Sequence, residues 1–234
     1  MKFQKMTALL LAIAMFGTVV GCSGSENNNN TSQNTESTVS NETEQSETKN
    51  SSATKTDSGK TLVIYFSGAN TKSSDAVTGA TQVQGKDGAV QHLAELIHNN
   101  VGGDIVKIVP SKDYALEYDK VADEAKAERD NNERPKFEDL GVNIADYDTV
   151  YVGYPMWWYT LPMIMYTFFD TYDFSGKTII PFNTHLGSGD GGTYQTIKEF
   201  EPNATVKDGL AVSGSSVFDD STAKTVKDWL NGLR

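Results

Sequence analysis

Short, mostly apolar runs alternate with helical patterns from residue 60 to the end of the chain, and this alternation constrains the fold more than any other feature. The apolar runs cover residues 61–66, 104–109, 149–152, 177–182 and 209–212. The helical patterns cover residues 89–97, 118–131, 163–169, 193–200 and 222–230. Strands that are apolar throughout are buried on both faces, as in parallel sheets whose crossover helices cover both sides. We therefore predict an α/β fold of the doubly wound type, in which a five-stranded parallel sheet is the middle layer of a three-layer sandwich.

The N-terminal residues follow a different pattern, which is typical of a targeting signal. Lys2 and Lys5 precede an apolar run at residues 6–20, and Cys22, the only cysteine of the chain, follows that run. A charged start, a short apolar segment and a small residue before a cleavage site indicate a secretory signal; the run is too short to span a membrane comfortably. Residues 1–21 resemble a bacterial lipoprotein signal peptide, which implies lipidation of Cys22 and anchoring at the extracytoplasmic face of the cell membrane. The alternative is an ordinary signal peptide with an incidental cysteine.

A polar segment separates this signal from the rest of the chain. Residues 22–59 are almost entirely small, polar or charged, and Val39 is their only large apolar residue. Such a composition cannot bury enough apolar surface to offset the entropy cost of ordering, so we predict a disordered tether. Residues 60–234 then have the size of one domain. The formal net charge of the chain is −11, which argues against nucleic acid as a partner.

Three of the predicted strands end in segments of unusual composition, and the carboxyl ends of parallel strands meet at one edge of the sheet, where ligands bind. The first segment, Ser-Gly-Ala-Asn-Thr at 67–71, offers hydroxyl and N–H groups that suit a phosphate. The second, at 153–159, contains two adjacent tryptophans, and we expect at least one to face solvent or to stack on a flat ligand. The third, at 182–192, is rich in glycine, which lets the backbone approach a ligand. Taken singly, the first segment also fits a common turn, the second a tryptophan packed in the core, and the third a mobile loop.

Together the three segments resemble the flavodoxin-like family, in the branch that has Tyr-Phe-Ser, Pro-x-Trp-Trp and Pro-Phe-x-Thr with Gly-Ser-Gly after successive strands. The resemblance covers residues 60–234, and Tyr-Asp-Phe-Ser-Gly-Lys-Thr-Ile-Ile-Pro-Phe at 172–182 is a close match. It implies a sheet order of 2-1-3-4-5 and bound FMN. The implied phosphate ligands are Ser67, Asn70 and Thr71. The implied ring contacts are Pro155, Met156, Trp157 and Trp158 on the ring face and Thr184, His185, Gly187 and Gly189 at the polar edge.

The chain departs from that family after the first strand. Flavodoxins usually run Ser/Thr-x-Thr-Gly-Asn-Thr directly into the first helix, whereas here Ala69 stands where Thr-Gly is expected and residues 70–86 are inserted. We therefore expect a phosphate cradle in two pieces, with Ser67 before the insertion and the N–H groups of Gly88, Ala89 and Val90 after it. Asn70 and Thr71 are then either ligands or the start of an excursion over the site.

The resemblance implies an extracytoplasmic, lipid-anchored FMN protein that transfers electrons between a redox partner and an acceptor, each either a protein or a small molecule. One alternative is a reductase that takes hydride from NAD(P)H or reduces quinones, and another is a ligand-binding module without redox chemistry. Hydrolysis by Ser67 with His185 as base is disfavoured, because no Gly-x-Ser-x-Gly elbow surrounds Ser67. His92 and His98 do not share one helix face, so no metal site is expected.

Overall fold

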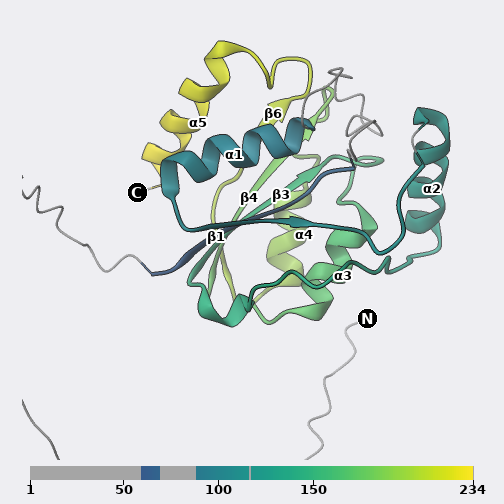
Figure 1. Cartoon of the computed structure of the whole chain (residues 1–234), viewed down its shortest axis with the longest axis horizontal. Helices are drawn as coiled ribbons and strands as arrows, with labels where there is room; N and C mark the ends of the chain where they lie inside the picture. The colour runs from purple at the N-terminus through teal and green to yellow at the C-terminus, as the bar shows by residue number, and fades with distance from the viewer. Residues whose placement is uncertain (1–58, 69–87, 116, 234) are drawn as a thin grey trace, which may run out of the picture. The chain divides into compact units, whose positions relative to one another are not determined.

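The computed structural model describes residues 59–68, 88–115 and 117–233. These residues form a parallel β-sheet with helices on both faces (Figure 1). The strands are β1 (Thr61–Phe66), β2 (Asp104–Ile108), β3 (Thr149–Pro155), β4 (Thr178–His185), β5 (Thr205–Val206) and β6 (Leu210–Ser213). The helices are α1 (Ala89–Val101), α2 (Tyr118–Asp130), the 3-10 turn η2 (Ile144–Asp146), α3 (Met163–Thr171), α4 (Thr193–Phe200) and α5 (Asp220–Gly232). The predictions for the signal peptide, Cys22, the tether, Asn70 and Thr71 lie outside the described residues.

The order of the strands confirms the prediction from the sequence. The sheet runs β2-β1-β3-β4-β5, and every pairing in it is parallel. Two strands share the fifth position, because β5 pairs with Thr178 and Ile179 at the start of β4 and β6 pairs with residues 182–185 at its end. The predicted fifth strand corresponds to β6. Strand β5 was not predicted from the sequence, because a run of two residues has no periodicity.

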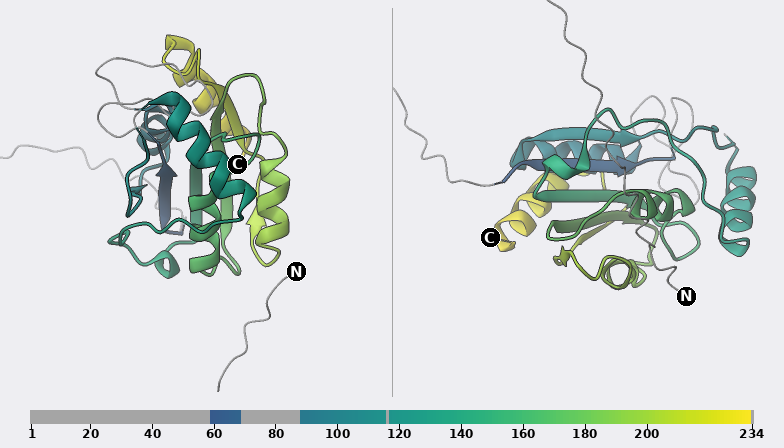
Figure 2. Two further views of the ribbon diagram at one scale, coloured as in Figure 1. Left: turned by 90° about the vertical axis from the view of Figure 1, so that its right-hand side faces the viewer. Right: turned by 90° about the horizontal axis from the view of Figure 1, so that it is seen from below.

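Apolar side chains form one core on each side of the sheet, since successive residues of a strand point to opposite faces. Leu62, Ile64 and Phe66 of β1 pack with α2, α3 and α4, whereas Val63 and Tyr65 pack with α1 and α5. Figure 1 shows α1 and α5 above the sheet and α3 and α4 below it, and the views in Figure 2 place α2 beyond the carboxyl ends of β1 and β2. The three-layer arrangement is therefore the one that the uniformly apolar strands predicted.

Two strands extend further than the sequence predicted. The ladder between β3 and β4 continues through the pairs Tyr154 with Asn183 and Pro155 with Thr184. Asn183 and Thr184 are both fully buried there, although the sequence placed them in a loop. Asparagine and proline are poor strand formers, and the pairing of β4 with strands on both sides keeps Asn183 in the sheet.

Helix α2 is exposed over most of its surface, as predicted, and buries only Val121 and Ala125. None of the helices in the described ranges is long and apolar enough to cross a membrane.

Gly153 tests the close contact between β3 and β4. A Cβ atom added at Gly153 would overlap the ring of Phe182, which is fully buried and has no room to move. We expect Gly153→Ala to lower the free energy of unfolding by roughly 1–3 kcal/mol, the usual cost of overpacking a core. Urea denaturation measures this. Gly232→Ala is the control, because an added Cβ meets nothing within 4 Å there. Equal stability of Gly153→Ala and the wild type would contradict the contact.

Candidate functional site

A two-residue turn follows β3 at the carboxyl edge of the sheet. The backbones of Trp157 and Thr160 exchange two hydrogen bonds, each with an N···O distance of 3.0 Å. The central residues Trp158 and Tyr159 have φ angles of +50° and +63°. This is the geometry of a type I′ turn, for which Asn-Gly is the usual sequence. Non-glycine residues in this region cost about 1–3 kcal/mol each and cluster at functional sites.

Trp157 is the buried member of the tryptophan pair. Its ring lies edge-on to Phe66, with a centroid distance of 5.3 Å, and edge-on to Tyr114, at 4.9 Å. The indole also lies beside the end of β1, because a Cβ added at Gly68 would be 2.9 Å from its Cζ2 atom. The Nε1–H group is buried and has no hydrogen-bond acceptor among the described residues. An unmet donor of this kind costs about 1–3 kcal/mol unless a ligand accepts its hydrogen bond.

Trp158 turns the other way, toward α2. Its Nε1–H donates to the carbonyl of Ala122 at 2.9 Å, and the guanidinium of Arg129 lies 5.3 Å from its ring centroid. The side chain is half-buried. The adjacent tryptophans therefore have different surroundings, and the stacking of either on a flavin stays a prediction.

The same turn contacts the glycine-rich loop after β4. A Cβ added at Gly191 would lie 3.1 Å from Cε of Met156 and 3.4 Å from the carbonyl oxygen of Tyr159. Gly191 has a φ of +54°, so both its conformation and its surroundings favour glycine. Pro155 is buried as the last residue of β3. The turn after β3 and the glycine-rich loop after β4 thus lie side by side.

Thr184 and His185 end β4 at this edge. The Thr184 hydroxyl is buried and has no hydrogen-bond partner in the described part of the chain. His185 Nδ1 accepts a hydrogen bond from the Gly187 N–H at 2.9 Å. Partial burial lowers the pKa of His185, and Asp190 opposes this only in part, so the neutral imidazole carries its proton on Nε2 when Nδ1 accepts.

The loop from Gly187 to Gly192, here called the glycine loop, presents backbone donors. Gly187 and Gly189 have φ angles of +95° and +60°. The N–H groups of Ser188, Gly189 and Asp190 have no acceptor among the residues that the structure describes. Three consecutive donors at the carboxyl edge suit a ligand that carries carbonyl or anionic oxygens.

The predicted phosphate cradle has two described parts. Ser67 follows β1 and is buried. Gly88 is the N-cap of α1, its φ and ψ are extended, and it has no side chain to cap the helix. Ala89 and Val90 begin the helix and are buried. The N-terminal end of a helix favours an anion through its N–H groups and its dipole.

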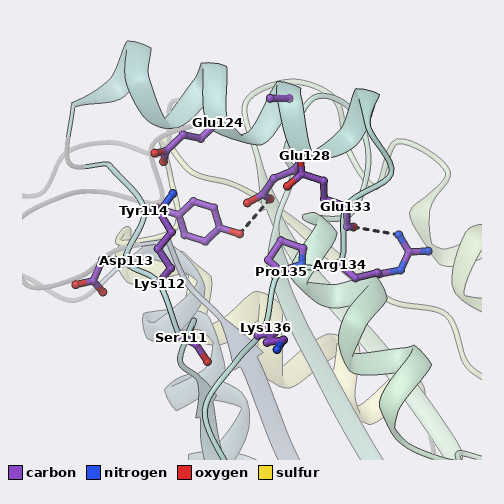
Figure 3. Close-up of a pocket in the computed structure, with 11 residues that line it drawn as sticks. Ser111, Lys112, Asp113, Tyr114, Glu124, Glu128, Glu133, Arg134, Pro135 and Lys136 are labelled. Atoms are coloured by element: carbon purple, nitrogen blue, oxygen red, sulfur yellow. Dashed lines mark hydrogen bonds between the residues drawn. The ribbon is translucent and has the colours of Figure 1, made fainter.

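A cavity of ≈ 670 Å³ lies beside this edge, between α2 and the segments 111–114 and 133–136 (Figure 3). Tyr114 lines the cavity and also contacts Trp157. Its hydroxyl donates to Glu128 Oε2 at 3.1 Å. Burial raises the pKa of Glu128 to about 7, with Glu133 and Glu124 adding to the effect and the Tyr114 hydrogen bond opposing it.

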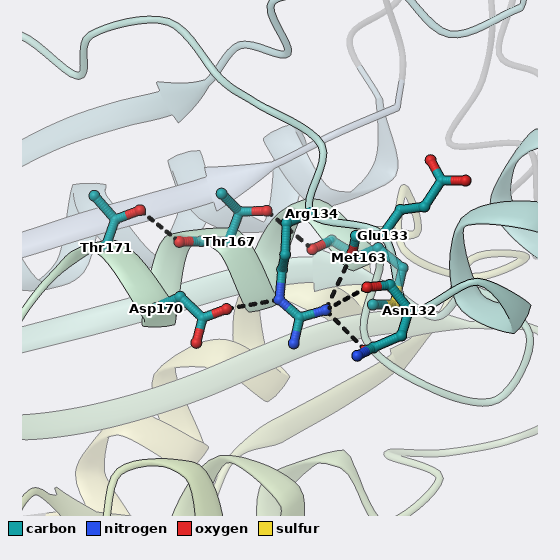
Figure 4. Close-up of polar contacts among 7 residues, drawn as sticks. All are labelled: Asn132, Glu133, Arg134, Met163, Thr167, Asp170 and Thr171. Carbon is teal, nitrogen blue, oxygen red and sulfur yellow. Dashed lines mark hydrogen bonds and ion pairs between the residues drawn. The ribbon is translucent and has the colours of Figure 1, made fainter. Parts of the chain in front are cut away.

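An ion pair holds the far wall of this cavity in place. Arg134 Nε donates to Asp170 Oδ2 of α3 at 2.6 Å, and Arg134 Nη1 donates to the carbonyl and the side chain of Asn132 (Figure 4). The chain after α2 is thereby tied to α3. The sequence analysis missed both Tyr114 and Glu128. Glu128 could have been found, because it continues the buried face of α2 that Val121 and Ala125 begin, at helical spacing.

The fold and this edge define a doubly wound α/β protein whose ligand site lies at the carboxyl ends of β1, β3 and β4. The chain belongs to the flavodoxin family: the family model described as Flavodoxin matches residues 60–233.

Solved structures give the same result. Two proteins, each described as a putative flavoprotein, come from Bacteroides uniformis and Bacteroides eggerthii. The first is 30% identical, covers 74% of this chain and 99% of its own, and has a TM-score of 0.58. The second is 29% identical, its match covers 74% of this chain and 97% of the Bacteroides eggerthii chain, and its TM-score is 0.58. A flavoprotein from Lactobacillus acidophilus in complex with FMN shares the fold, at 17% identity, 73% and 99% coverage and a TM-score of 0.52. No curated protein matches the chain.

Glu128→Gln tests the environment of the cavity. The variant keeps an acceptor for the Tyr114 hydroxyl but removes the carboxyl that titrates. The pKa of Glu128 is about 7 in the folded state against an ordinary 4.5, so the folded protein binds more protons between these values and its stability falls as pH rises through them. We expect the variant to be more stable than the wild type at pH 8, and the difference to vanish below pH 4.5.

Glu117→Gln is the matched control on the same helix. The Lys120 hydrogen bond lowers the pKa of Glu117, so its ionised form is favoured by folding. This variant should lose stability at pH 8 relative to the wild type, the opposite sign to Glu128→Gln. Urea denaturation at several pH values measures the stability of both variants. If both variants lose stability at pH 8, the cavity does not raise the pKa of Glu128.

Proposed function

We propose that this protein is an extracytoplasmic, lipid-anchored FMN protein that transfers electrons between a redox partner and an acceptor. The observation that carries the proposal is the position of two buried polar atoms, Trp157 Nε1 and Thr184 Oγ1. They are the buried side-chain atoms without a hydrogen-bond partner in the described ranges, and both lie at the carboxyl edge of the sheet. Buried polar groups are almost always hydrogen-bonded, and a ligand at this edge would supply the partner that the described residues do not give these two atoms.

The groups at this edge fit FMN, which has an anionic phosphate and a flat ring with a polar edge. Ser67, the start of α1 and the Trp157 Nε1–H are the donors that would hold the phosphate. The Thr184 hydroxyl and the N–H groups of Ser188, Gly189 and Asp190, which have no acceptor among the described residues, would hold the polar edge of the ring. Met156 is buried beside Gly191 and would contribute an apolar wall. FMN supplies electron-transfer chemistry when bound, and the protein supplies binding, orientation and electrostatics.

The comparisons support the same cofactor. The Bacteroides uniformis relative, described as a putative flavoprotein, is 30% identical over 74% of this chain. The flavoprotein from Lactobacillus acidophilus, which shares the fold, was solved with FMN. Together with the match to the flavodoxin family, these relatives favour a flavin over other planar ligands with a phosphate.

The cellular location rests on the N-terminal sequence alone. Two lysines, a short apolar run and Cys22 form a lipoprotein-type signal. The polar segment at 22–59 would hold the domain away from the membrane. The net charge of −11 favours a protein redox partner with a basic surface, because complementary charge speeds association.

A second candidate function is a reductase that takes electrons from a small molecule. The cavity beside Tyr114 favours a reductase. Tyr114 lines the cavity and contacts Trp157, and the cavity has room for a second ligand. Steady oxidation of NADPH or NADH by the purified FMN-loaded protein would support this candidate, and a protein that exchanges electrons only with a partner protein would support the first.

Trp157→Phe tests the FMN site. The variant keeps an aromatic ring in the core but removes the Nε1–H donor. We expect the dissociation constant for FMN to rise roughly tenfold to a hundredfold, the effect of losing one hydrogen bond to a charged group. Quenching of flavin fluorescence measures it. Trp158→Phe is the control, because its lost hydrogen bond is to Ala122 of α2, and it should change the constant less. A wild-type protein that is colourless and leaves the fluorescence of added FMN unchanged would refute the proposal.

Cys22→Ser tests the lipid anchor. In a bacterial host fed an alkyne-labelled fatty acid, we expect the wild type to incorporate the label, because the thiol of Cys22 is the only one in the chain. The serine variant should carry no label, whereas Ser23→Ala, which keeps the thiol, should be labelled like the wild type. Label on Cys22→Ser at the wild-type level would overturn the assignment.

A further inference from the structure

We propose that two tyrosines, the buried Tyr154 and the partly buried Tyr194, act as positioning residues that fix the conformation of the glycine loop. Each tyrosine donates to a polar side chain that in turn donates to a carbonyl of the loop. The inference rests on the proposed function for the identity of the ligand, but the effect on the loop itself can be measured without any ligand.

The first of these chains of hydrogen bonds passes through Asn183. This residue is fully buried in β4, where an amide side chain is costly unless its polar groups are hydrogen-bonded. Asn183 Oδ1 accepts from the Tyr194 hydroxyl at 2.6 Å, and Asn183 Nδ2 donates to the carbonyl of Gly189 at 3.0 Å. One side chain thus joins a strand, the first turn of α4 and the glycine loop.

The second chain of hydrogen bonds runs parallel to the first, one residue further along the loop. Thr193 Oγ1 donates to the carbonyl of Asp190 at 2.6 Å, so its hydrogen is used there. The contact of 2.8 Å between Thr193 Oγ1 and the Tyr154 hydroxyl is therefore donated by Tyr154. Two consecutive carbonyls, those of Gly189 and Asp190, are held by buried side chains.

The direction of these hydrogen bonds does not change with pH. Burial raises the pKa of Tyr194 and of Tyr154 above the ordinary range of a phenol, so both hydroxyls stay protonated and can donate. Because the Tyr194 hydroxyl donates, the amide oxygen of Asn183 faces it and the amide nitrogen faces the loop. A reversed amide would place its oxygen against the Gly189 carbonyl, with no hydrogen between two acceptors.

The held carbonyl fixes where the next N–H group points. In a trans peptide the C=O and N–H groups point in opposite directions. Because the carbonyl of Gly189 points toward Asn183, the N–H of Asp190 points away from β4. That N–H is one of the three donors of the loop without an acceptor in the described residues. Tyr194, acting through Asn183, therefore sets the orientation of a donor that is available to a ligand.

The ring of Tyr194 has a fixed place as well. A Cβ atom added at Gly209 would overlap this ring and the carbonyl of Pro181, so the absence of a side chain at Gly209 makes room for it. A ring held in this way loses little entropy when its hydroxyl forms the hydrogen bond to Asn183, which favours a preorganised loop.

Tyr194→Phe and Tyr154→Phe test the inference, because each removes one hydroxyl and keeps the ring. The first readout is amide hydrogen exchange in the full-length protein without FMN. Gly191 and Thr193 donate backbone hydrogen bonds to the carbonyls of Ser188 and Asp190 within the loop. We expect their exchange to become faster in both variants and fastest in the double variant, with exchange in β1 and β2 unchanged.

The second readout is the affinity for FMN and its midpoint potential. We expect the dissociation constant to rise roughly three- to tenfold in each single variant, the effect of loosening one hydrogen bond of neutral groups, and the potential to shift. Tyr147→Phe is the matched control. Tyr147 is also buried, and its hydroxyl donates to Asp104 at 2.6 Å, at the start of β2 and away from the glycine loop. This control should leave loop exchange, affinity and potential at their wild-type values.

The outcomes separate the inference from the proposed function. Faster exchange of the loop amides with weaker FMN binding supports both. A wild-type protein that binds no FMN refutes the proposed function, while faster exchange in the variants would still support the positioning role. The inference is overturned if Gly191 and Thr193 exchange at the wild-type rate in the double variant. It is also overturned if Tyr147→Phe loses as much FMN affinity as the two test variants, because the loss would then come from lower stability alone. If Tyr194→Phe does not fold, Tyr154→Phe and Thr193→Val give the same two results.

Discussion

Parallel pairing of the central strand β3 with both β1 and β4 is the constraint on which the rest of the structure depends. The ladder runs through Tyr65 and Gly153 on one side and through Pro155 and Thr184 on the other. Because the three strands share one direction, the segments that follow them leave the sheet at the same edge. With antiparallel pairing, the turn at residues 157–160 and the glycine loop would lie at opposite ends of the sheet, and no single ligand could contact both.

The groups at this edge are costly for the folded protein, and the two cores offset that cost. Trp158 and Tyr159 have left-handed backbone angles, and Trp157 Nε1 and Thr184 Oγ1 are buried with no hydrogen-bond partner among the described residues. Strain and unmet hydrogen bonds of this kind persist only where the surrounding packing fixes them. Helix α2 is part of that packing, because the carbonyl of Ala122 accepts a hydrogen bond from Trp158. The edge is thus arranged for a ligand rather than for maximal stability.

The fold could be predicted almost completely, whereas the site could be predicted only as a set of loops. The patterns at 61–66 and 193–200 coincide with β1 and α4 because local periodicity and burial agree there. The ends of β3 and β4 were missed, since Asn183 and Thr184 read as loop residues when the neighbouring strands are not considered. Tyr194 was missed too, although its spacing of three residues from the buried Ile197 places it on the inner face of α4.

The sequence by itself determined the order and type of the elements, the burial of both faces of the sheet and the chemical character of the three segments at its edge. Only the tertiary structure decided which side chains meet: that Trp157 enters the core, that Trp158 binds α2, and that Asn183 holds the glycine loop. The reason is physical. Periodicity and propensity act between residues a few positions apart, whereas the hydrogen bonds of Trp158 with Ala122 and of Tyr154 with Thr193 join residues 36 and 39 positions apart.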